Sequence, residues 1–211
     1  EKELAEFYPL DPDGARPIAY LWARTARCEA PNCGAEIPLA RSFWLAKKAG
    51  RRWALRYRVE RPKGRPPEVV FEVFQPKTEA DVPKGTVSRG NATCPACGTV
   101  LRVERVRAQL SQQRGGADVA FDEKGRRTGG ARLLAVVTVR PGEQGRHYRL
   151  PTPRDYLAVR RAKERLAAIL GEWEGGGRKG LCPVPDEPLP FMSGTFNVPL
   201  YGTRTWGDLF T

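Results

Sequence analysis

The stretches "RCEAPNCGAEIPL" (residues 27–39) and "ATCPACGTVL" (residues 92–101) contain four of the five cysteines of this chain. In each stretch the second cysteine is followed directly by a glycine. Four thiols in this arrangement can hold a metal that takes part in chemistry, hold a metal that only stabilises the fold, or form two disulfides. The choice decides whether the chain is interpreted as an enzyme or as a scaffold.

The spacing of these cysteines favours a structural zinc site. A tetrahedral zinc ion needs four thiolates, each about 2.3 Å away, and a short turn directs both of its cysteines to one side. Four protein ligands leave no coordination position for water or substrate, so such a site is structural. A Cys-x2-Cys turn is rarely a structural disulfide, and nothing in the sequence marks a secreted protein. A redox dithiol at "CPAC" would leave the first pair without a role. The predicted ligands are Cys28, Cys33, Cys94 and Cys97.

Few other residues suggest chemistry. His147 is the only histidine, and we expect it to be an exposed strand residue in "GRHYRL". Cys182, in "LCPVP", has no partner in the sequence and is expected to be a packed or free thiol. The sequence has no glycine-rich phosphate loop between a strand and a helix and no Ser, His and Asp set for nucleophilic catalysis. The chain alone is therefore not expected to be catalytic.

Composition indicates a globular protein that does not enter membranes. Of the 211 residues, 40% are hydrophobic and 28% are charged, which is typical of a soluble domain. No run approaches the roughly 18 apolar residues that a membrane span requires. The N-terminal "EKELAEFYPL" lacks the apolar core of a signal peptide, so we expect a cytoplasmic protein. Because the chain begins without Met and ends abruptly after "TWGDLFT", we also expect it to be part of a longer polypeptide.

The charge balance favours a polyanionic partner, and solubility or an Arg-rich genome composition is the alternative explanation. There are 36 Lys and Arg residues against 24 Asp and Glu, a formal net charge of +12, which is the electrostatic signature of nucleic-acid binding. The basic residues concentrate in "KKAGRRWALRYRVERPKGR" (residues 47–65), where Trp53 and Tyr57 interrupt them. Two interpretations remain open, phosphate binding by a strand hairpin or a solvated sheet face, and residues 126–132 offer a weaker second patch. The candidate nucleic-acid-binding residues are Lys47, Lys48, Arg51, Arg52, Arg56 and Arg58.

Hydrophobic periodicity predicts a strand-rich region followed by a helix. Trp53, Leu55 and Tyr57 alternate with polar or small residues, as in a half-solvated strand. The apolar run at 131–141 predicts the most buried strand. Further strands are expected at 18–28, 68–76 and 98–110, and a flexible Gly-rich loop is expected at 111–130. Residues 86–94 lead into the second cysteine pair.

The character of the sequence changes after residue 150. Thr152 before Pro153, with Asp155 three residues on, predicts the start of a helix. Apolar residues then recur with helical spacing up to Trp173, and a Pro-rich extended arm follows. We therefore predict an α+β protein with a β-rich zinc-ribbon domain at 1–150 and a helix plus an extended C-terminal arm at 151–211.

Several separated stretches together resemble a known family. They are "AYLWARTARCEAPNCGAEIPLARSFWLAKK", "VSRGNATCPACGTVL", "GGARLLAVV" followed by "YRLPTPRD", and "PDEPLP" followed by "YGTRTWGDLFT". In this order they are similar to the large prokaryotic adenine-specific DNA methylases that contain a zinc-ribbon segment. The resemblance covers nearly the whole chain and places it in the middle of a longer polypeptide.

The resemblance implies functional motifs that this chain does not contain. It implies an upstream "DPFxGxG"-like loop for S-adenosylmethionine and a downstream Asn/Asp-Pro-Pro-Tyr motif for the target adenine. The "DPDG" at 11–14 lacks the required glycines, and no Pro-Pro-Tyr occurs. Of the family's functional residues, only the four cysteines of the ribbon can be matched to positions in this chain. Some relatives lack these cysteines, which suggests that the cysteines have a structural rather than a catalytic role. A restriction or phage-defence context is also implied.

Two hypotheses follow. In the first, the chain is the zinc-ribbon region of an N6-adenine DNA methyltransferase, with DNA and the rest of the methyltransferase chain as partners. Zinc is then its structural cofactor, and S-adenosylmethionine binds only in the full-length protein. In the second, the chain is a stand-alone zinc-ribbon adaptor that binds RNA or a protein and is not an enzyme.

Overall fold

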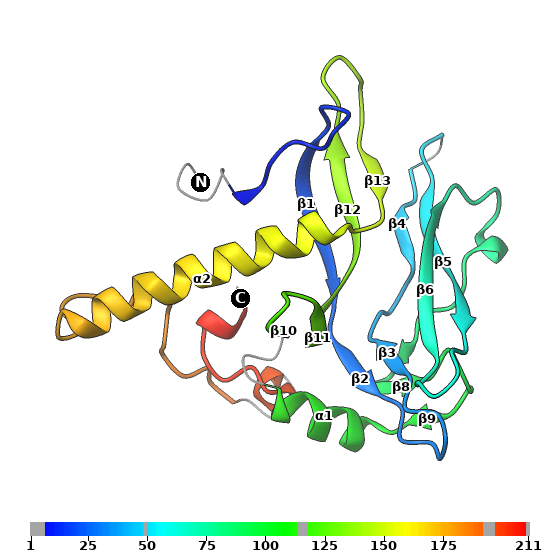
Figure 1. Cartoon of the computed structure of the whole chain (residues 1–211). Helices are drawn as coiled ribbons and strands as arrows, with labels where there is room; N and C mark the ends of the chain where they lie inside the picture. The colour runs from blue at the N-terminus through cyan, green and yellow to red at the C-terminus, as the bar shows by residue number, and fades with distance from the viewer. Residues whose placement is uncertain (1–6, 49, 114–117, 192–196, 210–211) are drawn as a thin grey trace.

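The computed structural model describes residues 7–48, 50–113, 118–191 and 197–209. The protein is a strand-rich α+β fold with several small antiparallel sheets and one long helix towards the C-terminus (Figure 1). The predicted fold class is therefore confirmed at this level. Among the described residues, no helix combines the length and apolar character that crossing a membrane would require.

The strand predicted to be most buried lies at the centre of the first sheet. This sheet has the order β1 (Arg16–Ala23), β12 (Arg132–Val139) and β13 (His147–Arg149), all antiparallel. Residues 133–138 of β12 are all buried, because the strand has neighbours on both sides. The near-continuous apolar run at 131–141 is thus explained by its central position.

A second sheet carries the predicted basic hairpin. It has the order β4 (Trp44–Ala46), β5 (Trp53–Glu60) and β6 (Glu68–Phe74). From Leu55 onwards β5 alternates as predicted, with inward side chains separated by exposed charged ones. Ala54, expected among the outward residues, is instead fully buried. A hydrophobic cluster joins this sheet to the first; its buried members are Ala23, Phe43, Leu55, Val69, Phe71 and Leu134.

The cysteines belong to a separate group of short strands. One pair of strands is β2 (Thr25–Arg27) with β3 (Glu36–Pro38). The other group is β7 (Val87–Ser88), β8 (Asn91–Thr93) and β9 (Val100–Leu101). Together with the helix that follows β9 they form a second hydrophobic cluster. Its buried members are Ala26, Cys28, Cys33, Ala35, Ile37, Ala92, Cys94, Ala96, Leu101, Val106 and Leu110.

The prediction of a strand over 98–110 is wrong beyond Leu101. The chain forms the helix α1 (Val103–Gln112) instead. Val106 and Leu110, one helical turn apart, lie on the same face of α1 and are both buried in the cysteine-containing cluster. The Gln109 side chain also bonds both backbone groups of Arg27, which attaches α1 to β2.

The prediction of a flexible loop over 111–130 is also wrong for its described part. A hairpin forms between β10 (Val119–Phe121) and β11 (Arg127–Gly130). A Cβ atom on Gly130 would lie 1.8 Å from the Asp118 carbonyl oxygen, so the close approach of the two strands requires glycine. The Thr25 hydroxyl donates to the Gly130 carbonyl at 2.7 Å, which fixes the hairpin to β2. Residues 114–117 lie outside the described residues.

The helix α2 (Pro153–Gly175) begins with the predicted capping box, in which the Thr152 and Asp155 side chains each bond the other's backbone. Its apolar stripe is only half-buried, and Figure 1 shows α2 extending away from the sheets. Of its residues, only Asp155 and Ala158 are buried.

The C-terminal arm contains two short 3-10 helices, η3 (Val198–Tyr201) and η4 (Gly207–Leu209); a third, η2 (Glu79–Asp81), follows β6. The arm returns to α1, since a Cβ on Gly202 would meet the Leu110 carbonyl oxygen at 2.4 Å. Residues 192–196 of the arm lie outside the described residues, and the domain boundary at residue 150 stays a prediction.

Candidate metal centre

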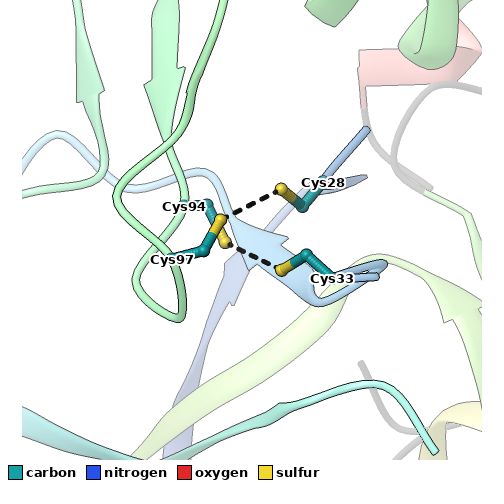
Figure 2. Close-up of side chains that lie close together, drawn as sticks. All are labelled: Cys28, Cys33, Cys94 and Cys97. Atoms are coloured by element: carbon teal, nitrogen blue, oxygen red, sulfur yellow. Dashed lines mark hydrogen bonds between the residues drawn. The ribbon is translucent and has the colours of Figure 1, made fainter. Parts of the chain in front are cut away.

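Each cysteine pair lies at the tip of a short hairpin. The β2–β3 hairpin carries Cys28 and Cys33, and the β8–β9 hairpin carries Cys94 and Cys97. Figure 2 shows the side chains of the two pairs pointing towards one another across the gap between the hairpins. We call these two tips the first and the second knuckle.

Each knuckle is closed by an equivalent backbone hydrogen bond of its own. The Cys28 amide donates to the Ala35 carbonyl oxygen, and the Cys94 amide donates to the Thr99 carbonyl oxygen, each at 2.9 Å. In both cases the acceptor is the residue that follows the glycine after the second cysteine. Gly34 has φ of 62° and Gly98 has φ of 76°, so each chain reversal uses the left-handed region that glycine adopts without strain.

The first knuckle is longer by two residues. Asn32 absorbs part of this extra length with φ of 60°, a value that asparagine tolerates better than most residues. The Cys33 amide donates to the Ala30 carbonyl oxygen at 3.1 Å, which closes the additional turn. The looser Cys-x4-Cys spacing therefore gives the same hairpin closure as the tighter Cys-x2-Cys spacing.

The sulfur positions suit tetrahedral coordination. The Sγ atoms of Cys28 and Cys97 are 3.6 Å apart, those of Cys33 and Cys94 are 3.8 Å apart, and all four lie within 4.8 Å of one another. Ligands about 2.3 Å from a tetrahedral zinc ion are about 3.8 Å from each other. A disulfide needs about 2.05 Å, and all five cysteines are free. The four predicted ligands therefore come together and can bind a metal ion such as zinc.

The four thiols are not equivalent. Burial raises the pKa of the Cys28 thiol to about 12 and also raises the pKa of Cys94. Cys97 is exposed, and its hydrogen bonds with the side chain and then the backbone of Thr99 lower its pKa to about 6. A metal must displace protons from the buried thiols, so its affinity falls as the pH falls.

Two arginines flank the cysteine cluster, and the sequence interpretation missed both. The Arg61 guanidinium donates to the Ala96 carbonyl oxygen in the second knuckle at 2.6 Å. Arg105 of α1 pairs with Glu29 in the first knuckle at 2.8 Å. Arg61 brings a positive charge beside the second knuckle, whereas the Arg105 charge is offset by Glu29 and serves to attach α1 to the first knuckle. No local motif marks these residues, because each reaches its knuckle from a distant part of the chain.

The six candidate nucleic-acid-binding residues fall into two groups. Lys47, Lys48, Arg51 and Arg52 are exposed beside the turn between β4 and β5. Arg56 and Arg58 project from the exposed face of β5.

This β5 face is not a net positive surface. Arg56 makes two bonds to Glu72, at 2.7 and 2.9 Å, and Arg58 pairs with Glu60 at 2.7 Å. Glu68 lies opposite Glu60 on the same face. The carboxylates thus offset both guanidinium charges, and nucleic-acid binding by the six residues stays a prediction.

The weaker basic patch at 126–132 is engaged within the fold. Arg127 pairs with Glu36 at 2.9 Å, and both side chains are largely buried. Arg132 donates to the Val69 carbonyl oxygen at 2.7 Å and lies over the Phe71 ring. These arginines hold β11 and β12 to neighbouring strands.

His147 and Cys182 lie outside the cluster. Within the described part of the chain, the one group of three or more His, Cys, Asp or Glu residues able to share a metal consists of the four cysteines. His147 is on β13 as predicted, but it is half-buried and its Nε2 lies 2.9 Å from a Glu143 carboxylate oxygen. Cys182 is a free, half-buried thiol in the arm.

Comparison of the chain with protein-family models, with curated proteins and with solved structures gives no match.

Proposed function

We propose that this chain is the zinc-ribbon region of an S-adenosylmethionine-dependent N6-adenine DNA methyltransferase of the restriction or phage-defence type. The observation that carries the proposal is the cluster of Cys28, Cys33, Cys94 and Cys97, which is the arrangement that the sequence resemblance to that family implies. The net charge of +12 agrees with a role beside DNA.

In this proposal the metal stabilises the fold and takes no part in methyl transfer. Four sulfur ligands leave no open coordination position, so the ion joins the two knuckles. The chain's own basic residues contact phosphates, which positions the duplex without reading its sequence. Transfer of the methyl group to a flipped adenine takes place in segments outside this chain.

The coding sequence on either side of the chain provides the first test. We expect an upstream glycine-rich loop after a strand and a downstream Asn/Asp-Pro-Pro-Tyr motif. The protein that includes both segments should convert adenine to N6-methyladenine in duplex DNA, detected by mass spectrometry of digested nucleosides. A variant with Ala in place of the Tyr of that motif is the control. Absence of both motifs from the flanking sequence would overturn the proposal.

The second candidate is a non-enzymatic adaptor, and the apolar stripe on α2 favours it. Leu166, Ile169 and Trp173 are only half-buried. A half-buried apolar stripe of this kind can receive a protein partner. An adaptor would bind its partner through α2 and would methylate no DNA with or without S-adenosylmethionine.

A further inference from the structure

The turn between β4 and β5 and the turn between β12 and β13 lie at the same end of their two sheets (Figure 1). Side chains connect the two segments. The rings of Trp53 and Tyr148 pack with centroids 5.9 Å apart. A Cβ on Gly145 would lie 2.5 Å from Nη1 of Arg51, so this guanidinium rests directly on the second turn. Residues that are distant in the sequence therefore form one surface.

Five exposed basic side chains lie on these two turns. We call this group the basic end, and it consists of Lys47, Lys48, Arg51, Arg52 and Arg146.

Among the described residues, none of the five basic-end side chains forms an ion pair with a carboxylate. The Lys47 ammonium lies 5.2 Å from the centre of the Trp44 ring, and Arg52 donates to the Lys77 carbonyl oxygen at 3.1 Å. Each of these contacts leaves the positive charge without a counterion.

The nearby acids are engaged elsewhere. Glu143, in the second turn, lies 2.9 Å from His147 and 3.7 Å from Arg140. Asp81 accepts the backbone amides of Lys77 and Thr78. Both carboxylates are thus held by groups other than the basic-end side chains. The contrast with β5 is direct, because Arg56 and Arg58 each have a carboxylate partner within 2.7 Å.

We propose that the basic end, rather than the exposed face of β5, binds the phosphate backbone of duplex DNA. The choice of DNA rests on the proposed function, whereas the location rests on the charges described above. Each lysine or arginine that neutralises a phosphate releases condensed counterions, and an arginine already paired with a glutamate releases few. Five unpaired side chains on two adjoining turns therefore supply most of the salt-dependent affinity.

Two double variants with the same net charge separate the two surfaces. Lys48→Gln with Arg51→Gln removes two charges from the basic end. Arg56→Gln with Arg58→Gln removes two charges from β5. Binding of each protein to a fluorescently labelled DNA duplex is measured by anisotropy at several salt concentrations, and thermal unfolding confirms that each variant is folded.

We expect the basic-end variant to bind at least about tenfold more weakly at low salt. The decrease of log K with log salt should also become shallower, with the magnitude of the slope smaller by about two. The β5 variant should stay within about twofold of the wild type. Equal losses in the two variants, or a loss confined to the β5 variant, would overturn the inference but leave DNA binding, and with it the proposed function, standing. If the wild-type chain binds no duplex DNA, or binds only RNA, both the inference and the DNA-positioning role fail.

Discussion

At the scale of single residues, each cysteine in the cluster contributes one sulfur ligand. Serine has nearly the same size but is a poor ligand for zinc, so Cys94→Ser removes a ligand while leaving the packing largely unchanged. We expect bound zinc to fall well below the wild-type level of about one ion per chain, and the free energy of unfolding to fall by more than about 4 kcal/mol. Metal analysis and chemical denaturation measure the two effects.

Cys182→Ser is the matched control for this change. Cys182 is a free thiol outside the cluster, so the variant should keep its zinc and its stability. Zinc retention by the Cys94 variant under reducing conditions would show that the four sulfurs do not form the site.

The ionisation of Asp155 makes the free energy of unfolding depend on pH in the acidic range. Burial by itself would raise the pKa of Asp155, but hydrogen bonds from Arg149 and Thr152 outweigh it and leave the pKa below its usual value. Since the pKa is lower in the folded state than in the unfolded state, the stabilisation is present above about pH 4 and is lost as the pH falls through the folded value.

Asp155→Asn should therefore destabilise the protein by about 1.5–3 kcal/mol at pH 7, because it removes the charged hydrogen bonds of Asp155 while Arg149 keeps its pair with Asp11. The difference from the wild type should shrink below about pH 4. Denaturation at a series of pH values measures this. Glu164→Gln, at an exposed pair with Arg160, should change stability by less than about 1 kcal/mol. A constant difference between the Asp155 variant and wild type across this range would contradict the assignment.

Among the elements, the knuckles depend on glycines with positive φ. Gly98→Ala adds a Cβ that meets no atom within 4 Å, so its cost is the backbone strain alone. We expect a loss of about 1–2 kcal/mol in unfolding free energy with zinc retained. Gly171→Ala, within α2 and equally uncrowded, should stabilise the protein by about 0.5–1 kcal/mol. Urea denaturation compares them, and the same sign for both substitutions would contradict this explanation.

The elements also show how far local sequence determines the fold. The start of α2 was predictable because Thr152, Pro153 and Asp155 act on one another within one turn. Arg102, which precedes α1, makes no side-chain cap, and the adjacent β-branched valines favour a strand locally. The burial of Val106 and Leu110 against the knuckles decides in favour of a helix, and this is a tertiary effect.

The candidate site divides in the same way. The four ligands were predictable because each pair is local and is followed by a glycine. The two arginines that contact the knuckles, Arg61 and Arg105, were not predictable, because they reach the knuckles through long-range contacts. The counterions of Arg56 and Arg58 could be located only after the register of β5 with β6 was known.

At the scale of the whole molecule, the described residues form two hydrophobic clusters, and the cysteine knuckles belong to only one of them. Removal of zinc with a chelator should therefore loosen the knuckles and α1 more than the central strand β12. We expect hydrogen exchange at residues 25–38 and 91–112 to accelerate by at least tenfold more than at residues 132–139. Uniform acceleration along the chain would instead indicate that the two clusters unfold as one unit.

Because each knuckle is closed by its own local hydrogen bond, the two knuckles can form before they meet. Each hairpin closes through local contacts, on the microsecond timescale of isolated hairpins, whereas the two tips are 61 to 69 residues apart along the chain. Joining segments so far apart has an entropic cost, which the shared hydrophobic cluster and the metal–sulfur bonds offset together. Zinc uptake then becomes a late step, so newly made chains in zinc-depleted cells should accumulate as protease-sensitive intermediates in which the two knuckles are only loosely held together.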